Sequence, residues 1–151
     1  MRTASFFFLL WILYPFMLSA QKTDFLTFYE KSGYTKTPRY SETIDYCKQL
    51  AKSSPWIKYE SYGISPQNRE LPLLIADKQG LFTVDEVRKS GKAVMLIQAC
   101  IHAGESDGKD AGLMLLRDIA ILKKHAHLLD NVTILFIPIV SPDGHERFGP
   151  Y

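Results

Sequence analysis

The sequence predicts an α/β domain, because two strand-like apolar runs flank a segment with helical periodicity. Residues 93–99 (Ala-Val-Met-Leu-Ile-Gln-Ala) and 132–137 (Val-Thr-Ile-Leu-Phe-Ile) are nearly continuous apolar runs, which are typical of strands covered on both faces. Between them, apolar side chains recur at helical spacing from Asp107 to Leu122. A strand, a helix and a second strand in this order form a parallel crossover unit, which is right-handed in nearly all proteins.

The elements before this unit are expected to be a helix and an antiparallel hairpin. A helix is predicted at about 42–52, with Ser41 as its N-cap. Residues 56–64 and 70–76 are rich in branched and aromatic side chains, and a turn-forming Ser-Pro-Gln-Asn sequence lies between them. One further helical turn is predicted at 84–89.

Two glycines mark the face of the later helix that meets the sheet. Gly108 and Gly112 lie one turn apart in the periodic segment. Because glycine has no side chain, we expect the helix to approach the sheet closely there.

Composition and charge narrow the class of protein. The chain has 151 residues, which is enough for one domain, and its net charge is +2. Lys and Arg are scattered, and no phosphate-cradling motif or repeat is present, so a nucleic-acid partner is not expected. The two cysteines, Cys47 and Cys100, fall in a predicted helix and at a strand end, and we expect buried free thiols rather than a disulfide.

Residues 1–20 have the pattern of a signal peptide. Arg2 supplies the positive start, residues 6–18 are almost wholly apolar, and small residues lead up to Ala20. The apolar run is short for a membrane span. We therefore expect cleavage after Ala20, export to the periplasm or out of the cell, and no stable membrane span afterwards. Residues 21–40 are polar and aromatic and are predicted to be a lead-in arm.

The carboxyl ends of the two predicted parallel strands carry polar, glycine-containing loops. Binding sites form at this edge of open α/β sheets, so residues 102–108 and 141–145 are expected to share one rim. His102 follows the first strand and Glu105 opens the helix, whose positive end favours an ionised carboxylate. An imidazole and a carboxylate are typical zinc ligands, and a catalytic zinc ion usually has three from the protein. We predict His102 and Glu105 as metal ligands, although the same spacing also occurs in solvated loops.

Two longer runs extend this pattern. Residues 101–112 read Ile-His-Ala-Gly-Glu-Ser-Asp-Gly-Lys-Asp-Ala-Gly, and residues 138–148 read Pro-Ile-Val-Ser-Pro-Asp-Gly-His-Glu-Arg-Phe. The first resembles the metal motif of the carboxypeptidase A-like zinc carboxypeptidase family, and the second is similar to that family's Asn-Pro-Asp-Gly segment, with Ser141 where the family often has Asn. Their order and separation also match, and the likeness covers roughly residues 40–151.

The resemblance implies a zinc metallocarboxypeptidase, which is a hydrolase that removes C-terminal residues from a peptide or protein substrate. It implies a mixed central sheet flanked by helices, with His102 and Glu105 as the first two zinc ligands. In that family zinc lowers the pKa of a bound water, a glutamate is the general base, and arginines hold the substrate. Residues 41–151 are then expected to be the N-terminal portion of the catalytic domain, incomplete at its C-terminus.

The family's remaining functional residues have no counterpart before Tyr151. Its third zinc ligand, substrate-binding arginines and general-base glutamate all follow the Asn-Pro-Asp-Gly segment, so no catalytic residue is predicted within the chain. His145 is the best substitute for the third ligand, although the resemblance assigns it to a structural loop. The remaining polar candidates are expected to be solvated (His125, His127, Arg147), to cap the helix (Asp107, Asp110) or to order their own turn (Asp143).

Three functions are open at this point. The first is an active peptidase present here as an N-terminal fragment. In that case the sheet edges and one apolar face are expected to be exposed in the fragment and covered by the rest of the domain. The second is a naturally truncated, inactive relative that acts as a binding or scaffold protein. The third is an unrelated α/β hydrolase, which the missing Gly-x-Ser-x-Gly motif disfavours. The sequence does not indicate which side chains the substrate carries at the cleaved bond, or whether that bond lies in a peptide or in a cell-wall amide. It does not indicate the oligomeric state either.

Overall fold

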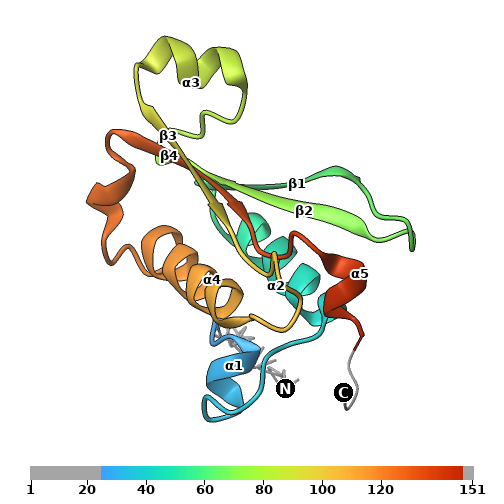
Figure 1. The fold of residues 1–151 in the computed structure, drawn as a ribbon. Coiled ribbons are helices and arrows are strands. Elements are labelled where there is room, and N and C mark those ends of the chain that lie inside the picture. Colours follow the sequence, from blue (N-terminus) through green and yellow to red (C-terminus); the bar gives the residue numbers. More distant parts are fainter. Residues whose placement is uncertain (1–24, 148–151) are drawn as a thin grey trace, which may run out of the picture.

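Four strands form one mixed sheet in the computed structural model, which describes residues 25–147 (Figure 1). The strands are β1 (Ile57–Ile64), β2 (Glu70–Ala76), β3 (Ala93–Gln98) and β4 (Val132–Ile137), in the order β1-β2-β4-β3. β1 and β2 form an antiparallel hairpin, β2 pairs antiparallel with β4, and β3 pairs parallel with β4. The predicted hairpin, parallel crossover and mixed sheet are therefore confirmed.

The helices confirm three of the predicted segments and add three short ones. They are α1 (Phe28–Lys31), α2 (Tyr40–Ser53), α3 (Val84–Ser90), α4 (Asp107–Ala120), the 3-10 turn η1 (Ala126–Leu129) and α5 (Pro142–His145). α1 lies within the predicted lead-in arm, and α5 lies within the second predicted loop. The predicted signal peptide, residues 1–20, falls outside the described residues. Between residues 25 and 147, none of the helices has the length and apolar character that a membrane crossing needs.

The start of α2 corrects one prediction. Arg39, not Ser41, is the N-cap residue, and the Glu42 carboxylate accepts a hydrogen bond from the Arg39 backbone N–H at 2.9 Å. The helix begins earlier because Glu146 accepts the Tyr40 N–H at 2.8 Å, which satisfies a donor that would otherwise lack a partner. This partner is distant in sequence, so local patterning could not reveal it.

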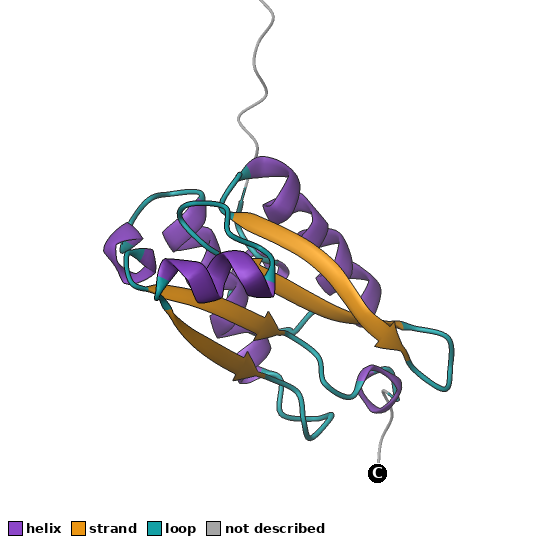
Figure 2. Ribbon diagram, turned by 90° about the horizontal axis from the view of Figure 1, so that it is seen from above, coloured by secondary structure: helices purple, strands orange, loops and turns teal. Residues whose placement is uncertain are grey.

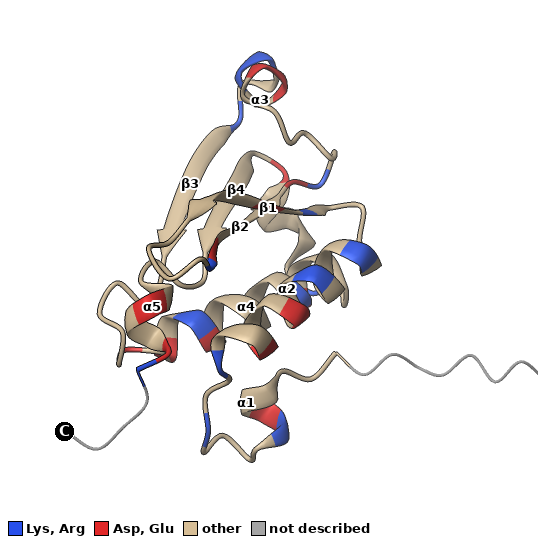
Figure 3. Cartoon of the chain, turned by 90° about the vertical axis from the view of Figure 1, so that its right-hand side faces the viewer, with Lys and Arg blue, Asp and Glu red and all other residues tan. Residues whose placement is uncertain are grey.

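α2 and α4 pack on one face of the sheet and bury the main core (Figure 3). Their apolar stripes meet the inward-facing residues of β2 and β4. The buried cluster includes Cys47, Leu50, Leu74, Ala76, Leu113, Leu116, Ile119, Ile134 and Phe136. Both cysteines are buried and free, as expected, and burial raises the pKa of the Cys47 thiol to about 12.

Gly112 is the position where α4 comes closest to the sheet. A Cβ atom placed on Gly112 would lie 2.6 Å from Phe136 Cε2, whereas one on Gly108 would meet the Ala99 Cβ at an ordinary 3.4 Å. The predicted close approach is therefore confirmed at Gly112, where the Phe136 ring occupies the space.

Gly112→Ala is expected to destabilise the fold by about 1–3 kcal/mol, because an overpacked core must shift to admit the methyl group. Urea denaturation measures the loss in the free energy of unfolding. Gly108→Ala is the matched control on the same helix, and we expect no loss there because alanine favours a helix over glycine. Equal stability of the two variants would contradict the close packing of Gly112.

β3 corrects a second prediction, because it lies at an edge of the sheet rather than between covered faces. Val94, Met95 and Leu96 are 56%, 51% and 54% exposed. Neither β3 nor β4 contains a charged residue (Figure 3). The apolar run indicated a strand buried on both faces, but residues 25–147 bury it only in part.

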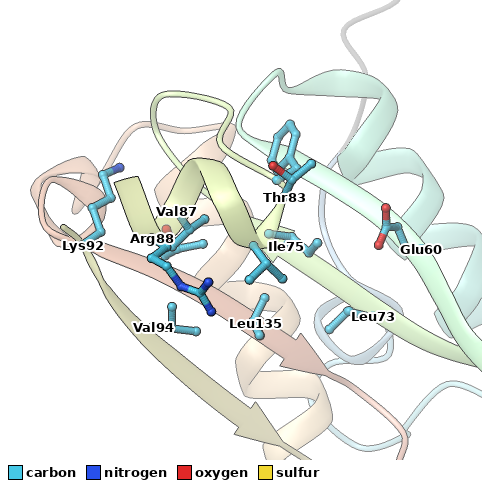
Figure 4. Close-up of a pocket in the computed structure, with 12 residues that line it drawn as sticks. Glu60, Leu73, Ile75, Thr83, Val87, Arg88, Lys92, Val94 and Leu135 are labelled. Atoms are coloured by element: carbon cyan, nitrogen blue, oxygen red, sulfur yellow. The ribbon is translucent and has the colours of Figure 1, made fainter. Parts of the chain in front are cut away.

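The other face of the sheet carries α3 and an apolar cavity. Seen from above, α3 lies across the near side of the sheet, and the long helices lie behind it (Figure 2). A cavity of about 580 Å³ separates α3 from the strands, with Val87 on one side and Ile75, Val94 and Leu135 on the other (Figure 4). It lies at the start of β3, away from the loops at the strand ends.

Candidate metal centre

The loops after β3 and β4 lie side by side. The β3–β4 ladder continues past both strands, because the Ala99 N–H donates to the Ile137 carbonyl at 2.9 Å and the Val140 N–H donates to the Ala99 carbonyl at 3.0 Å. The Ser141 N–H then reaches the Cys100 carbonyl at 3.2 Å. The expectation that the two loops share one rim is therefore confirmed by their backbone hydrogen bonds.

His102 and Glu105 lie on one tight turn at this rim. The Glu105 N–H donates to the His102 carbonyl at 3.0 Å, which closes the turn between them. Both residues are exposed. Ser106 follows as the N-cap residue of α4, and its carbonyl accepts the N–H groups of Lys109 and Asp110. Glu105 thus stands just before the positive end of a fourteen-residue helix, where an anion is stabilised.

An open hollow of about 420 Å³ adjoins the two side chains. Residues of the loop and of the strand that feeds it form its wall: Gln98, Ala99, Cys100, Ile101, His102, Glu105, Asp107 and Gly108. Cys100 turns the chain out of the strand with a φ of 50°, a left-handed conformation that sends the loop away from the sheet.

The two side chains suit part of a zinc ligand set. Imidazole nitrogen and carboxylate oxygen are both common zinc ligands, and catalytic zinc sites use three protein ligands. Residues 25–147 contain no cluster of three or more His, Cys, Asp or Glu side chains placed to hold a metal ion. The described part of the chain therefore offers this pair without a third ligand.

His145, the best substitute for a third ligand, lies in a different environment. Its side chain is buried, and Nε2 is 3.0 Å from the Lys109 Nζ. Lys109 is also fully buried and donates to the Pro38 carbonyl at 2.7 Å. His145 therefore contacts an internal ammonium group rather than the exposed rim.

Lys109 has a structural role that the sequence analysis missed. It lies on the same helical stripe as Leu113, Leu116 and Ala120, at i, i+4, i+7 and i+11, and all four residues are buried. A lysine on an apolar stripe requires an internal acceptor. That placement was a readable signal of a buried polar contact.

Asp143 corrects the prediction that it orders its own turn. Its carboxylate crosses to the tip of the β1–β2 hairpin, where it accepts the Ser65 hydroxyl at 2.7 Å, the Gln67 N–H at 3.1 Å and the Arg69 guanidinium at 2.7 Å. Burial alone would raise the pKa of the Asp143 carboxyl, but these hydrogen bonds outweigh it and hold the pKa below its ordinary value. Asp143 therefore joins α5 to the hairpin.

The remaining candidates are divided by their burial. Asp107 is exposed, but Asp110 is buried, and no side chain caps the start of α4. The capping role predicted for Asp107 and Asp110 is therefore wrong. Burial raises the pKa of Asp110, against the opposing effects of Thr37 and Lys109. His125, His127 and Arg147 are exposed, as expected.

Solved structures with the same arrangement include carboxypeptidases. Carboxypeptidase A from Helicoverpa armigera matches with a TM-score of 0.63 and 22% identity, over 73% of this chain and 26% of that one. A metallo-carboxypeptidase from Burkholderia cenocepacia matches with a TM-score of 0.57 and 20% identity, over 71% of this chain and 28% of that one. The sheet and its helices thus have the fold of the carboxypeptidase A class.

Sequence comparison then identifies the family. The family model described as zinc carboxypeptidase matches residues 43–150. Carboxypeptidase 2 of Trichophyton rubrum is 31% identical over 120 residues, which are 78% of this chain. The chain belongs to the zinc carboxypeptidase family, as the two motifs predicted. It spans 22% of the length of that curated relative.

Proposed function

We propose that this chain is the N-terminal portion of a zinc-dependent metallocarboxypeptidase that hydrolyses peptide bonds in peptide or protein substrates. The observation that carries the proposal is the His102–Glu105 turn, which stands at the carboxyl end of β3 in a chain of this family. The remaining ligand and the general base are supplied by sequence that follows Tyr151.

In this proposal the chain supplies two of the three protein ligands of the zinc centre. His102 and Glu105 are the first two zinc ligands, and the tight turn between them fixes their separation. Glu105 stands just before the positive end of α4, which favours a negatively charged ligand group there. When bound, zinc supplies Lewis acidity and activates water for hydrolysis of the peptide bond.

Metal analysis of the full-length protein tests the ligand assignment. We expect the wild-type protein to hold one zinc ion per chain, and we expect Glu105→Gln and His102→Ala to lose both zinc and peptidase activity. His127→Ala is the matched control, because His127 is an exposed histidine on η1, far along the chain from the rim. Stoichiometric zinc in Glu105→Gln would remove Glu105 from the ligand set.

The intact mass of the native protein tests whether the chain continues. We expect a mass well above that of residues 21–151, recovered from the exported fraction after cleavage at Ala20. A mass equal to that of Gln21–Tyr151 would overturn the proposed catalysis, because the protein would then lack a third ligand and a general base.

A further inference from the structure

α5 lies directly behind the turn that carries His102 and Glu105. A Cβ atom placed on Gly144 would come within 3.0 Å of the Ala103 Cβ and 2.9 Å of the Ser141 Oγ, so α5 touches the residue after His102. The backbone bonds from Val140 and Ser141 to the loop after β3 tie the same segments together. The position of α5 therefore sets the position of the turn.

Two separate contacts hold α5 in place. Asp143 fixes one side to the hairpin tip through Ser65, Gln67 and Arg69. On the other side, the His145 Nε2 faces the Lys109 Nζ at 3.0 Å, with both side chains at least 97% buried. The second contact joins α5 to the first turn of α4, which immediately follows the His102–Glu105 turn.

The Lys109–His145 contact requires one protonation state. A lysine ammonium group has three donors and no acceptor, so the His145 Nε2 must present its lone pair. The proton of the neutral ring then sits on Nδ1, which lies 3.5 Å from a Glu146 carboxylate oxygen. Protonation of Nε2 would place a second cation beside the Lys109 ammonium with no water between them.

The surrounding charges favour the neutral ring. Burial lowers the pKa of His145, Lys109 and Arg39 lower it further, and Glu146 opposes them. Burial also lowers the pKa of Lys109, and nearby groups oppose this shift by favouring the ammonium form. Those groups are Asp110, Cys100, Glu146 and Glu42.

We propose that Lys109 and His145 are positioning residues that hold the His102–Glu105 turn through α5, and that protonation of His145 in mild acid releases this hold. The acidic release deepens the proposed function, since it makes the geometry of the two ligands depend on pH. The contact itself belongs to the chain and exists without a metal.

Hydrogen exchange of the full-length protein tests the release, with the amides of Val140 and Ser141 as probes and those of β4 as the internal reference. As the pH falls below about 6.5, we expect the opening equilibrium of the probes to rise by up to about tenfold per pH unit, until the lowered pKa of the folded state is reached. In His145→Gln the side-chain amide oxygen still accepts a hydrogen bond from Lys109 but does not titrate. We therefore expect the probes to be protected as in the wild type near neutral pH, with an opening equilibrium that does not change with pH. His127→Gln is the control and should behave as the wild type does.

Two results would overturn the proposal. One is wild-type protection that does not change with pH, and the other is a pH dependence that persists in His145→Gln. Lys109→Met should lose protection at every pH, but the His145→Gln comparison decides the question if that variant does not fold.

Zinc binding by the full-length protein separates this proposal from the proposed function. In mild acid, we expect wild-type zinc affinity to fall more steeply than that of His145→Gln. If the full-length protein binds no zinc at any pH, the proposed function fails and the exchange result still stands. If the zinc affinities of the wild type and of His145→Gln fall equally with pH, the proposed effect of His145 on the positions of His102 and Glu105 is refuted.

Discussion

Lys92→Met is expected to destabilise the fold by about 3–5 kcal/mol, because it leaves a buried carboxylate without its counter-charge. Asp77 is fully buried, and Lys92 Nζ donates to its carboxylate at 2.8 Å. The Thr133 hydroxyl donates at 2.6 Å, and the backbone N–H groups of Gln79 and Leu81 donate as well. This one carboxylate therefore joins the end of β2, the start of β3 and the inside of β4.

The same network gives the Lys92 prediction a pH dependence. Burial alone would raise the pKa of Asp77, but the hydrogen bonds from Lys92, Thr133 and the two backbone amides hold it below its ordinary value. A lowered folded-state pKa contributes stability that is present above about pH 4 and is lost as the pH falls through the folded-state value. Without Lys92 the pKa of Asp77 rises, so acid unfolding should begin at a higher pH.

Urea denaturation between about pH 3 and pH 7 measures both effects. Lys78→Met is the matched control, because Lys78 forms its 2.6 Å ion pair with Asp130 at the surface, where such pairs contribute little. A loss below about 1 kcal/mol in Lys92→Met would show that Thr133 and the backbone amides alone sustain the buried carboxylate.

Glu30→Ala is expected to detach α1 and to cost about 3 kcal/mol of unfolding free energy. The Glu30 carboxylate accepts the Thr27 N–H at 2.7 Å and forms a buried ion pair with Arg117 of α4. Its removal breaks the capping box of α1 and leaves the Arg117 guanidinium with Asp118 as its remaining carboxylate partner.

Hydrogen exchange and urea denaturation together measure the loss of α1. Glu30→Gln is the graded variant, because it keeps an acceptor for the Thr27 N–H but gives up the charge opposite Arg117. We expect its stability to lie between those of the wild type and Glu30→Ala. Unchanged exchange of the Lys31 amide, which donates to the Thr27 carbonyl at 3.0 Å, would show that α1 is held without Glu30.

Most of the fold could be predicted from the sequence because each long element has a strong local pattern. The apolar runs at 93–98 and 132–137 and the helical period after Asp107 fix a parallel crossover without knowledge of any partner. The turn at Ser65 and Pro66 fixes the hairpin in the same way. Their order then predicts one shared rim, and the structure places the two loops together there.

The errors have a common physical cause, which is contact between segments distant in sequence. The start of α2 depends on Glu146, α1 depends on Arg117, and Asp143 serves a turn almost eighty residues away. Exposure of β3 likewise depends on which neighbours flank the sheet and not on the strand's own residues. The pattern of a segment indicates its own preference for helix or strand, whereas these features depend on tertiary contacts with segments distant in sequence.

The way the sheet is joined has a consequence for how the chain folds. β1 and β2 are consecutive strands, as are β3 and β4, whereas β2 and β4, whose pairing joins the hairpin to the crossover unit within the sheet, are separated in sequence by α3, β3 and α4. That seam aligns Leu74, Ile75 and Ala76 with Phe136, Leu135 and Ile134. Closing it costs more chain entropy than forming either half. We therefore expect two early-forming units whose docking along β2 and β4 is the rate-limiting event of folding, with the Asp143 bridge to the hairpin forming as they dock.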